Sequence, residues 1–442
     1  MKRAILAVLV ASLSGCETYR PMQLEDRVTL RSAAHLEVDA KPVLSTHRFD
    51  PSNGLDMTEV AMLAVANNPA LKLARDDAGI ARAQAYSAGL LPDPQLSVGN
   101  DFPQQSVPGT VKAYNVGLGY DINSLLTHAL ISSASGMENQ KTDLNLLWQE
   151  WQVIAQARLL FSRVMSQETL LHWLTENQSL LKDRYEKARG AEMDGLVASD
   201  AVNIALAAWQ DAARQTNDLQ RLQLQTWNDL DALLGLQPGI RLGLVAGETE
   251  VFPDDAEVER ALERLADRRP DLLALKAGFA AQDARYRAAI LGQFPPLNLA
   301  FTRSRDNVGI NMYGFALTLA LPILNGNRGN IRIEQATRQR MRDEYQNRLN
   351  ADYAEAKQLI ADGSLIGAQL QTSQAGLHEL EETAPGAASA FSSGDLDGAA
   401  YAAIVSSRIA KRIEVARLQQ SLLEGKIALL TLLGAGAEGK HP

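Results

Sequence analysis

The chain has 442 residues, of which 46% are hydrophobic and 21% charged, a composition typical of folded protein and not of disordered segments. Its formal net charge of −9 and isoelectric point near 5.3 argue against a nucleic-acid binder, which would present a basic face. The length would accommodate two or three domains.

The first residues have the pattern of an export signal. Lys2 and Arg3 precede an apolar run over 4–13 that is too short to span a bilayer as a helix. The run ends in Leu13-Ser14-Gly15-Cys16, which resembles a bacterial lipobox, the motif at which a signal peptide is cut before a cysteine that becomes lipidated. Cys16 is the only cysteine of the chain, so an internal disulfide does not compete for it. The alternative is a chance cysteine behind an ordinary signal peptide.

Two halves of the chain repeat the same order of features. An offset of 201 residues aligns Pro69 with Pro270, Leu71 with Leu272 and Leu90 with Leu291. Each half begins with an Ala-rich helix, expected over 56–91 and 254–292 and broken before its proline. Two alternating segments follow each of these helices. A long helix, a Gly/Asp turn and another long helix complete each half, at 124–190 and 197–236, then at 327–391 and 399–434.

The alternating segments predict strands that are apolar on one side and small or polar on the other. We predict strands over 94–101, 113–121, 296–305 and 310–321. This alternation is typical of an outer-membrane barrel with a wet lumen, although half-buried strands of a soluble sheet would show it too. The residues expected to face lipid are Tyr114, Val116, Leu118, Tyr120, Leu297, Leu299, Phe301, Tyr313, Phe315, Leu317 and Leu319.

Four strands are too few to close a barrel, since the smallest outer-membrane barrels have eight. A barrel would therefore have to be shared among several chains. The two longest helical stretches, 124–190 and 327–391, are on the order of 100 Å each, which suits no globular core and predicts packing of helix on helix. Because Gly363, Gly367, Gly376 and Pro385 fall within the second of these, we expect interruptions there.

Several motifs resemble those of the TolC-like outer membrane factors, over about residues 50–434. The Asn68-Pro69-x-Leu71 and Arg269-Pro270-Asp271-Leu272 elements resemble the NPxL and RPDL signatures of that family. Other similar elements are the strand exit Leu321-Pro322-Ile323-Leu324-Asn325-Gly326 and the tip Gly195-Leu196-Val197-Ala198-Ser199-Asp200. Each motif is weak alone, and the order and spacing of the set make the resemblance specific.

The resemblance implies a trimeric, twelve-stranded outer-membrane β-barrel, with four strands and two structural repeats per chain, continued by a long α-helical periplasmic barrel. It implies a passive conduit of a tripartite export system in a Gram-negative bacterium. The expected partners are outer-membrane lipid, two further copies of the chain, a periplasmic membrane-fusion adaptor and an inner-membrane pump, without nucleic acid. The pump would determine the exported substrate. Glu17 favours the outer membrane, since the family of inner-membrane retention signals has aspartate there.

The turns between the long helices are expected at the end remote from the strands. We predict that Gly195, Leu196, Val197, Ser199 and Gly394 contact the adaptor. Some relatives carry aspartates after the second tip that line a closed aperture, whereas here the acids fall within the turn, as Asp395 and Asp397. These could form an acidic ring at the periplasmic mouth, or they could cap the following helix.

An enzyme is not expected, because the chain contains no HExxH, GxSxG or P-loop motif. The six histidines are scattered, so we expect no metal site, and no cofactor other than a lipid on Cys16. The remaining alternative is a lipid-anchored periplasmic coiled-coil scaffold or adaptor. The predicted division is a signal peptide at 1–15, an anchored tail at 16–55, repeats at 56–253 and 254–434, and a tail at 435–442.

Overall fold

The computed structural model describes residues 19–32, 49–104, 108–246 and 255–434. Residues 19–31 belong to a unit of their own and are exposed, and the rest of the described chain belongs to a second unit. Cys16, the predicted signal peptide and the predicted tail at 435–442 lie outside the described residues. Their assignment stays a prediction.

The first half begins with two short helices separated at a proline. A 3-10 turn, η3 (Pro51–Asn53), precedes α2 (Met57–Asn67), and α3 (Pro69–Ala88) follows after Asn68. The Asn68 side chain accepts a hydrogen bond from Leu71 N at 2.9 Å, and its amide donates to the Leu233 carbonyl at 2.9 Å. The residue before the proline therefore caps one helix and fastens it to the end of another.

The second half repeats this arrangement. Helices α6 (Asp255–Glu263) and α7 (Leu265–Arg268) precede α8 (Pro270–Leu291), with the break at Arg269. Proline at the first helical position lacks only a donor that would have no helical partner there. The breaks predicted before Pro69 and Pro270 are both confirmed.

Four strands form one antiparallel sheet in the order β1-β2-β3-β4. They are β1 (Gln95–Asp101), β2 (Ala113–Asp121), β3 (Leu297–Arg305) and β4 (Asn311–Leu319). Each lies where the alternation predicts a strand. The sheet joins the hairpins of the two repeats through β2 and β3, and it leaves β1 and β4 as edges.

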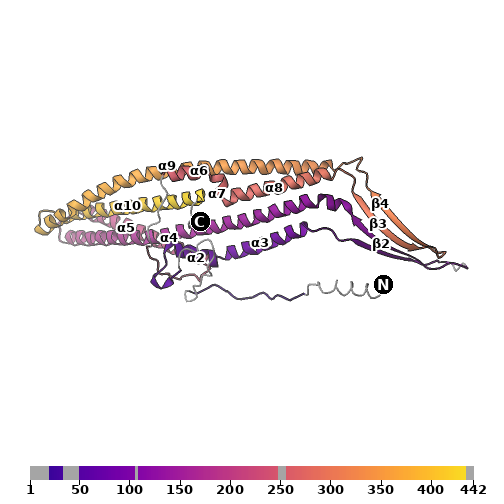
Figure 1. Ribbon diagram of the computed structural model, residues 1–442. Helices are drawn as coiled ribbons and strands as arrows, with labels where there is room; N and C mark the ends of the chain where they lie inside the picture. The colour runs from indigo at the N-terminus through magenta and orange to yellow at the C-terminus, as the bar shows by residue number, and fades with distance from the viewer. Residues whose placement is uncertain (1–18, 33–48, 105–107, 247–254, 435–442) are drawn as a thin grey trace. The chain divides into compact units, whose positions relative to one another are not determined.

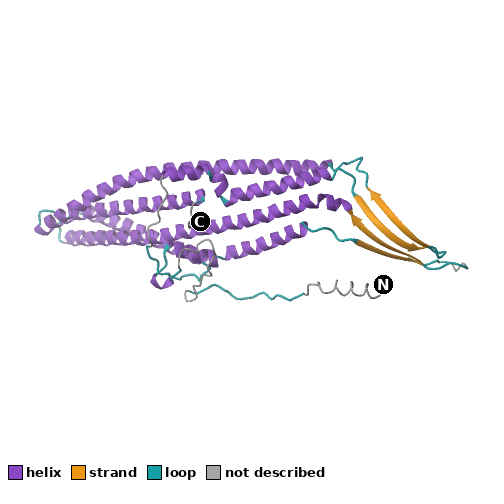
Figure 2. Ribbon diagram, viewed as in Figure 1, coloured by secondary structure: helices purple, strands orange, loops and turns teal. Residues whose placement is uncertain are grey.

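Four long helices make up most of the remaining structure (Figures 1 and 2). They are α4 (Ile122–Met193), α5 (Ser199–Leu233), α9 (Arg328–Ser393) and α10 (Gly398–Leu433). Helix α4 begins at the residue after β2 and has 72 residues, which is about 110 Å of helix. The turn that ends it is therefore about that far from the sheet.

The expected interruption of α9 is wrong. The helix continues through Pro385 from Arg328 to Ser393. Proline removes one hydrogen bond to the carbonyl four residues earlier, that of Glu381. Both Pro385 and Glu381 are exposed, so water can satisfy this carbonyl, and the many helical residues on either side outweigh one missing bond.

The helices pack in two successive sets of four. Next to the sheet, α4 contacts α3 and α8, and α8 contacts α9; farther away, α4 contacts α5 and α10, and α10 contacts α9. Where the sets meet, each repeat has a buried core under its short helices, around Leu63, Val164 and Leu230 in one and Leu265, Leu272 and Leu433 in the other. Helices α3 and α5 thus form one edge and α9 the other. No helix among the described residues has the length and apolar character needed to cross a membrane.

Candidate functional site

The register of the sheet assigns every strand residue to one of two faces. Residues directly opposite one another in antiparallel strands project to the same face. Leu118 is paired with Leu96 on β1 and with Phe301 on β3, and Phe301 is paired with Phe315 on β4. These side chains therefore form one continuous row across all four strands.

This apolar face contains all the residues predicted to face lipid. Tyr313 and Phe315 are 70% and 71% exposed, so no other described part of the chain covers them. Leu96 and Val98 belong to the same face, although their segment has the weakest alternation in the sequence. The predicted set that the register brings together is Tyr114, Val116, Leu118, Tyr120, Leu297, Leu299, Phe301, Tyr313, Phe315, Leu317 and Leu319.

The opposite side of the sheet, the small-residue face, is lined by glycine and by short polar side chains. Gly117 lies between Ser97 and Thr302, and Gly314 lies against Thr302. A Cβ at Gly117 would lie 2.6 Å from the Ser97 Oγ, and one at Gly314 would overlap the Thr302 hydroxyl. Glycine at these positions lets the neighbouring hydroxyls approach the backbone, and it leaves this side of the sheet without large side chains.

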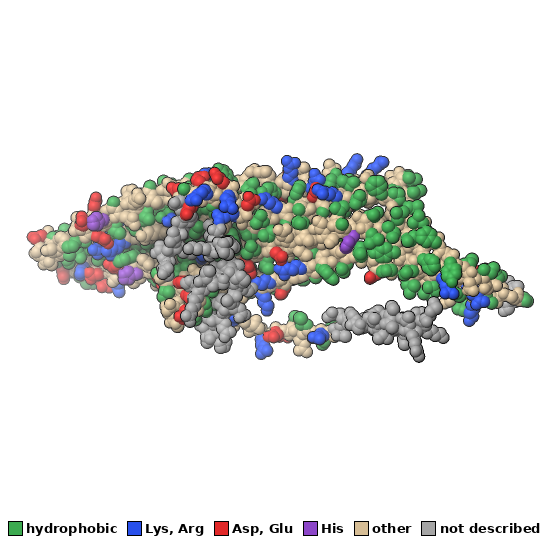
Figure 3. Space-filling view, in the orientation of Figure 1, with side chains coloured by type: hydrophobic (Ala, Val, Ile, Leu, Met, Phe, Trp, Pro, Cys, Tyr) green, Lys and Arg blue, Asp and Glu red, His purple; other side chains and the backbone are tan. Residues whose placement is uncertain are grey.

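A second apolar surface lies where strands meet helices. Its members are exposed residues at the ends of α3, α4 and α8 and after β4, and they gather beside the sheet in Figure 3. Ile323 and Leu324 are the most exposed, at 79% and 94%. The sequence indicated residues 321–326 only as a motif, because their apolar side chains follow neither a strand nor a helix period. The surface comprises Leu90, Leu91, Leu125, Leu126, Phe294, Leu321, Ile323 and Leu324.

The first tip turn joins α4 to α5 at residues 194–198. Gly195 has φ of +73°, a conformation that glycine adopts without penalty. Leu196 N donates to the Ala191 carbonyl at 2.8 Å and closes the end of α4. Leu196 is 76% exposed, whereas Ser199 starts α5 and donates its hydroxyl to Glu192. The backbone of the turn is thus held by hydrogen bonds, while the Leu196 side chain projects into solvent.

The second tip turn joins α9 to α10 at residues 394–397. Gly394 has φ of +82°, and Asp395 N donates to the Ala390 carbonyl at 2.8 Å. Asp397 accepts a hydrogen bond from Ala400 N at 2.7 Å, so it caps α10. Asp395 accepts one from the Ser393 hydroxyl at 2.6 Å. The capping interpretation therefore describes Asp397, and an acidic ring would need further copies of the chain.

A buried ionic cluster occupies the break between α7 and α8. Arg269 donates two hydrogen bonds to Asp271 at 2.9 and 2.7 Å and lies 3.1 Å from an Asp352 oxygen. Its guanidinium stacks over the Trp148 ring at 4.5 Å. Burial raises the pKa of Asp352, against the opposing effect of Arg269. This cluster joins α4, α8 and α9, and the sequence signalled only its Arg-Pro-Asp-Leu part.

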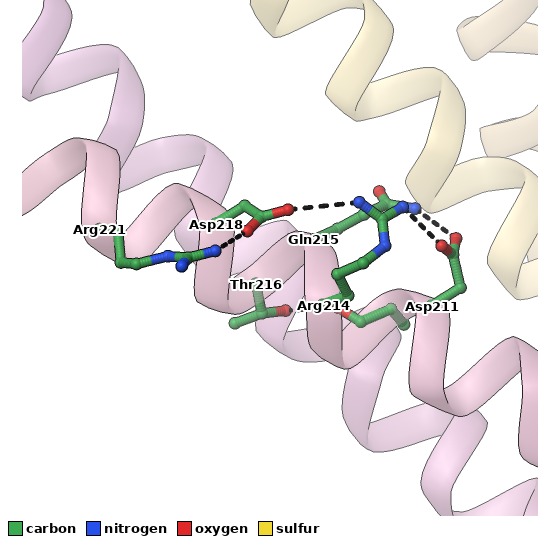
Figure 4. Close-up of polar contacts among 7 residues, drawn as sticks. Asp211, Arg214, Gln215, Thr216, Asp218 and Arg221 are labelled. Carbon is green, nitrogen blue, oxygen red and sulfur yellow. Dashed lines mark hydrogen bonds and ion pairs between the residues drawn. The ribbon is translucent and has the colours of Figure 1, made fainter.

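Helix α5 carries a ladder of exposed ion pairs (Figure 4). Arg214 contacts Asp211 at 2.7 Å and Asp218 at 3.3 Å, and Asp218 also accepts a hydrogen bond from Arg221. The hydrogen bond from Arg214 holds the pKa of Asp211 below its usual range. These charges are satisfied within one helix surface, as in a solvated helix face.

Most of the chain is similar to solved outer-membrane channels. It matches CusC, which forms a transmembrane channel, at 19% identity over 90% of this chain and 98% of CusC, with a TM-score of 0.70. It matches the outer-membrane channel OprN at 15% identity over 95% and 99%, with a TM-score of 0.73. It matches the Campylobacter jejuni CmeC outer membrane channel at 16% identity over 97% of this chain and 96% of that channel, with a TM-score of 0.72. The sequence matches no protein-family model and no curated protein.

The fold is therefore that of outer-membrane channels, and these structural neighbours are channels and not enzymes. It is the fold expected from the resemblance to the TolC-like outer membrane factors, which is confirmed at this level. At sequence identities of 15–19%, this similarity shows a shared fold and nothing about individual residues. The roles of individual residues have to be argued from this chain.

Proposed function

We propose that the chain is the outer-membrane exit duct of a tripartite efflux or export system, a passive conduit without chemistry of its own. The observation that carries this proposal is the sheet. It has an exposed apolar face, a small-residue face and a direct continuation from β2 into α4, a helix of about 110 Å. A periplasmic scaffold would need the helices but would gain nothing from an exposed apolar sheet.

The proposed assembly is a homotrimer. Both β1 and β4 are edges with unpaired backbone groups, which a water-free membrane does not tolerate. Pairing β1 of one copy with β4 of the next satisfies both edges. Three copies of four strands give twelve, whereas a single copy remains below the smallest closed barrel.

Channel activity is the direct test of this function. Purified full-length chain added to a planar lipid bilayer should produce discrete conductance steps. The Asp395→Asn/Asp397→Asn variant tests the proposed acidic ring in the same experiment, since three copies would bring six carboxylates together. Lower cation selectivity would support the ring. Unchanged selectivity and conductance would leave only the capping role.

The proposed partners dock at the two tip turns. Gly195, Leu196, Val197, Ser199 and Gly394 are the residues proposed to contact a periplasmic adaptor, which would couple the duct to an inner-membrane pump. Leu196 is the best probe, because it is exposed and its side chain makes no hydrogen bond that a crosslinker would disturb. A photocrosslinker at Leu196 should capture the adaptor in an assembled complex. No capture there would remove the docking proposal.

We also propose that Cys16 carries a covalent lipid. The support is the lipobox in a chain with a single cysteine. Cys16→Ala should abolish incorporation of labelled palmitate in cells. Persistent labelling would contradict the lipobox interpretation. The variant can still insert, because the proposed barrel offers far more apolar area than one lipid anchor.

A further inference from the structure

The apolar face ends in arginine. Arg303 and Arg305 continue the same side of β3 as Leu299 and Phe301. Arg303 is paired with Val116 and Tyr313, and Arg305 with Tyr114 and Asn311. Two guanidinium groups therefore project from the face that the proposed function turns toward lipid.

Neither arginine has an acidic partner among the described residues. Arg303 lies over the Tyr313 ring at 5.5 Å, and the Arg305 Nε has no hydrogen-bond partner there. The nearby Asp306 makes no ion pair with either arginine; its Oδ1 accepts hydrogen bonds from Val308 N at 3.0 Å and Ile310 N at 2.8 Å. Register assigns Asp101 to the small-residue face, since it pairs with Ala113. No carboxylate among the described residues neutralises either guanidinium, so the exposed Arg303 and the terminal nitrogens of the half-buried Arg305 can bind an external anion.

A third cation lies beside them in the register. Lys112 and Phe102 directly follow the last β1–β2 pair, and the Lys112 ammonium lies over the Phe102 ring at 5.1 Å. The side of the sheet that ends in Arg303 thus combines cations with aromatic rings. This combination is typical of the interface between a membrane and water.

The depth of these residues in a membrane follows from strand geometry. Arg303 is six residues beyond Leu297, which is about 20 Å along the strand and roughly 15 Å of depth at the tilt of a barrel strand. The exposed residues Leu321, Ile323 and Leu324 extend the apolar band at the helical end of the sheet. Arginine on the lipid side of a barrel costs most at the midplane and little near the interface. Arg303 and Arg305 therefore suit the headgroup level of the leaflet remote from the helices.

We propose that Arg303 and Arg305 bind the phosphate groups of an anionic lipid in the outer leaflet. This rests on the proposed function, because it requires the apolar face to be turned toward lipid. Guanidinium matches phosphate with two parallel hydrogen bonds, and aromatic rings beside it suit the lipid's apolar part. Three copies would place six guanidinium groups around the barrel.

The test uses purified full-length chain and phosphatidylcholine vesicles that contain lipid A with two phosphates, one phosphate or none. The measured quantity is the lipid A bound per chain. Wild-type protein should prefer the doubly phosphorylated form and lose this preference as salt rises. Equal binding of the three forms would overturn the proposal, and this comparison needs no variant.

Two variants sharpen the test. Arg303→Gln/Arg305→Gln should bind the doubly phosphorylated lipid about tenfold more weakly, since each cation near a charged membrane surface contributes a severalfold effect. Arg260→Gln/Arg264→Gln removes two exposed charges far along the helices and should bind as wild type. Wild-type affinity of the first variant, or an equal loss in the second, would contradict the assignment.

Conductance in the same vesicles separates this inference from the proposed function. Channels without any phosphate preference would leave the duct standing and remove the lipid site. If the wild-type chain neither inserts nor conducts in any vesicle, the proposed function itself fails, and the site with it.

Discussion

At the scale of single residues, the buried ionic cluster around Arg269 holds the break between α7 and α8 against α4 and α9. The sequence suggested a motif there, but it could not reveal Asp352, which lies on another helix far along the chain. Nor could it distinguish Arg269 from the exposed arginines of the same region, because burial depends on how α4 and α9 pack around the break.

Arg269→Leu should destabilise the helical unit by about 3–5 kcal/mol, because it leaves two buried carboxylates without their cation. Thermal unfolding followed by circular dichroism measures this. Arg82→Leu is the matched control, since Arg82 pairs with Asp143 at 2.6 Å on an exposed surface. Its expected cost is at most about 1 kcal/mol. Equal costs would show that the Arg269 cluster does not hold the break.

The Arg163–Glu424 pair, which joins α4 to α10, should make stability depend on pH. Burial raises the pKa of Glu424, but hydrogen bonds from Arg163 and Gln420 outweigh it and hold the pKa below its usual range. Because the pKa is lowered on folding, this stabilisation is complete above the unfolded value, about 4.3, and is lost as pH falls through the folded one.

Arg163→Leu should therefore cost about 1 kcal/mol near neutral pH, since the pair is only partly buried. The difference from wild type should shrink as pH falls below about 4.3 and through the lowered folded pKa of Glu424, because protonation removes the charge that Arg163 binds. A series of melting temperatures from neutral pH into acid measures it. An undiminished difference in acid would mean that Arg163 acts by packing and not by charge.

At the scale of elements, alternation predicted the four strands because period two is a local property of the chain. It also predicted which side of each strand is apolar, and the register confirms that these sides coincide across the sheet. The interruption expected at Pro385 was wrong, since a local rule ignores the helical turns on either side. The second apolar surface, where strands meet helices around Ile323, has neither a strand nor a helix period, so the sequence did not reveal it.

The two faces of β4 should respond differently to charge. Leu317→Arg places a charge on the apolar face and should cost roughly 2–4 kcal/mol near the midplane of the membrane, whereas Thr318→Arg on the small-residue face should cost less. The yield of heat-modifiable oligomer in the outer membrane compares these neighbouring substitutions. Equal tolerance would count against a membrane wall.

At the scale of the whole molecule, the backbone groups of the edge strands β1 and β4 have no partner strand among the described residues of one chain, so another copy must supply it. The edges β1 and β4 are different surfaces, so contact between copies is head to tail and gives either a closed ring or an open filament. The sequence resemblance implies three copies, and the strand count agrees with it. Closure itself depends on the angle between copies, which no property of one chain specifies.

Photocrosslinking between copies tests whether three chains share one barrel wall. A photoreactive amino acid at Phe315, on edge strand β4, should give covalent dimers and trimers and nothing larger. The same group at Leu118, on β2, should give none, because both neighbours of β2 belong to its own chain. A ladder beyond three chains, or equal crosslinking from the two positions, would contradict a closed barrel of three chains.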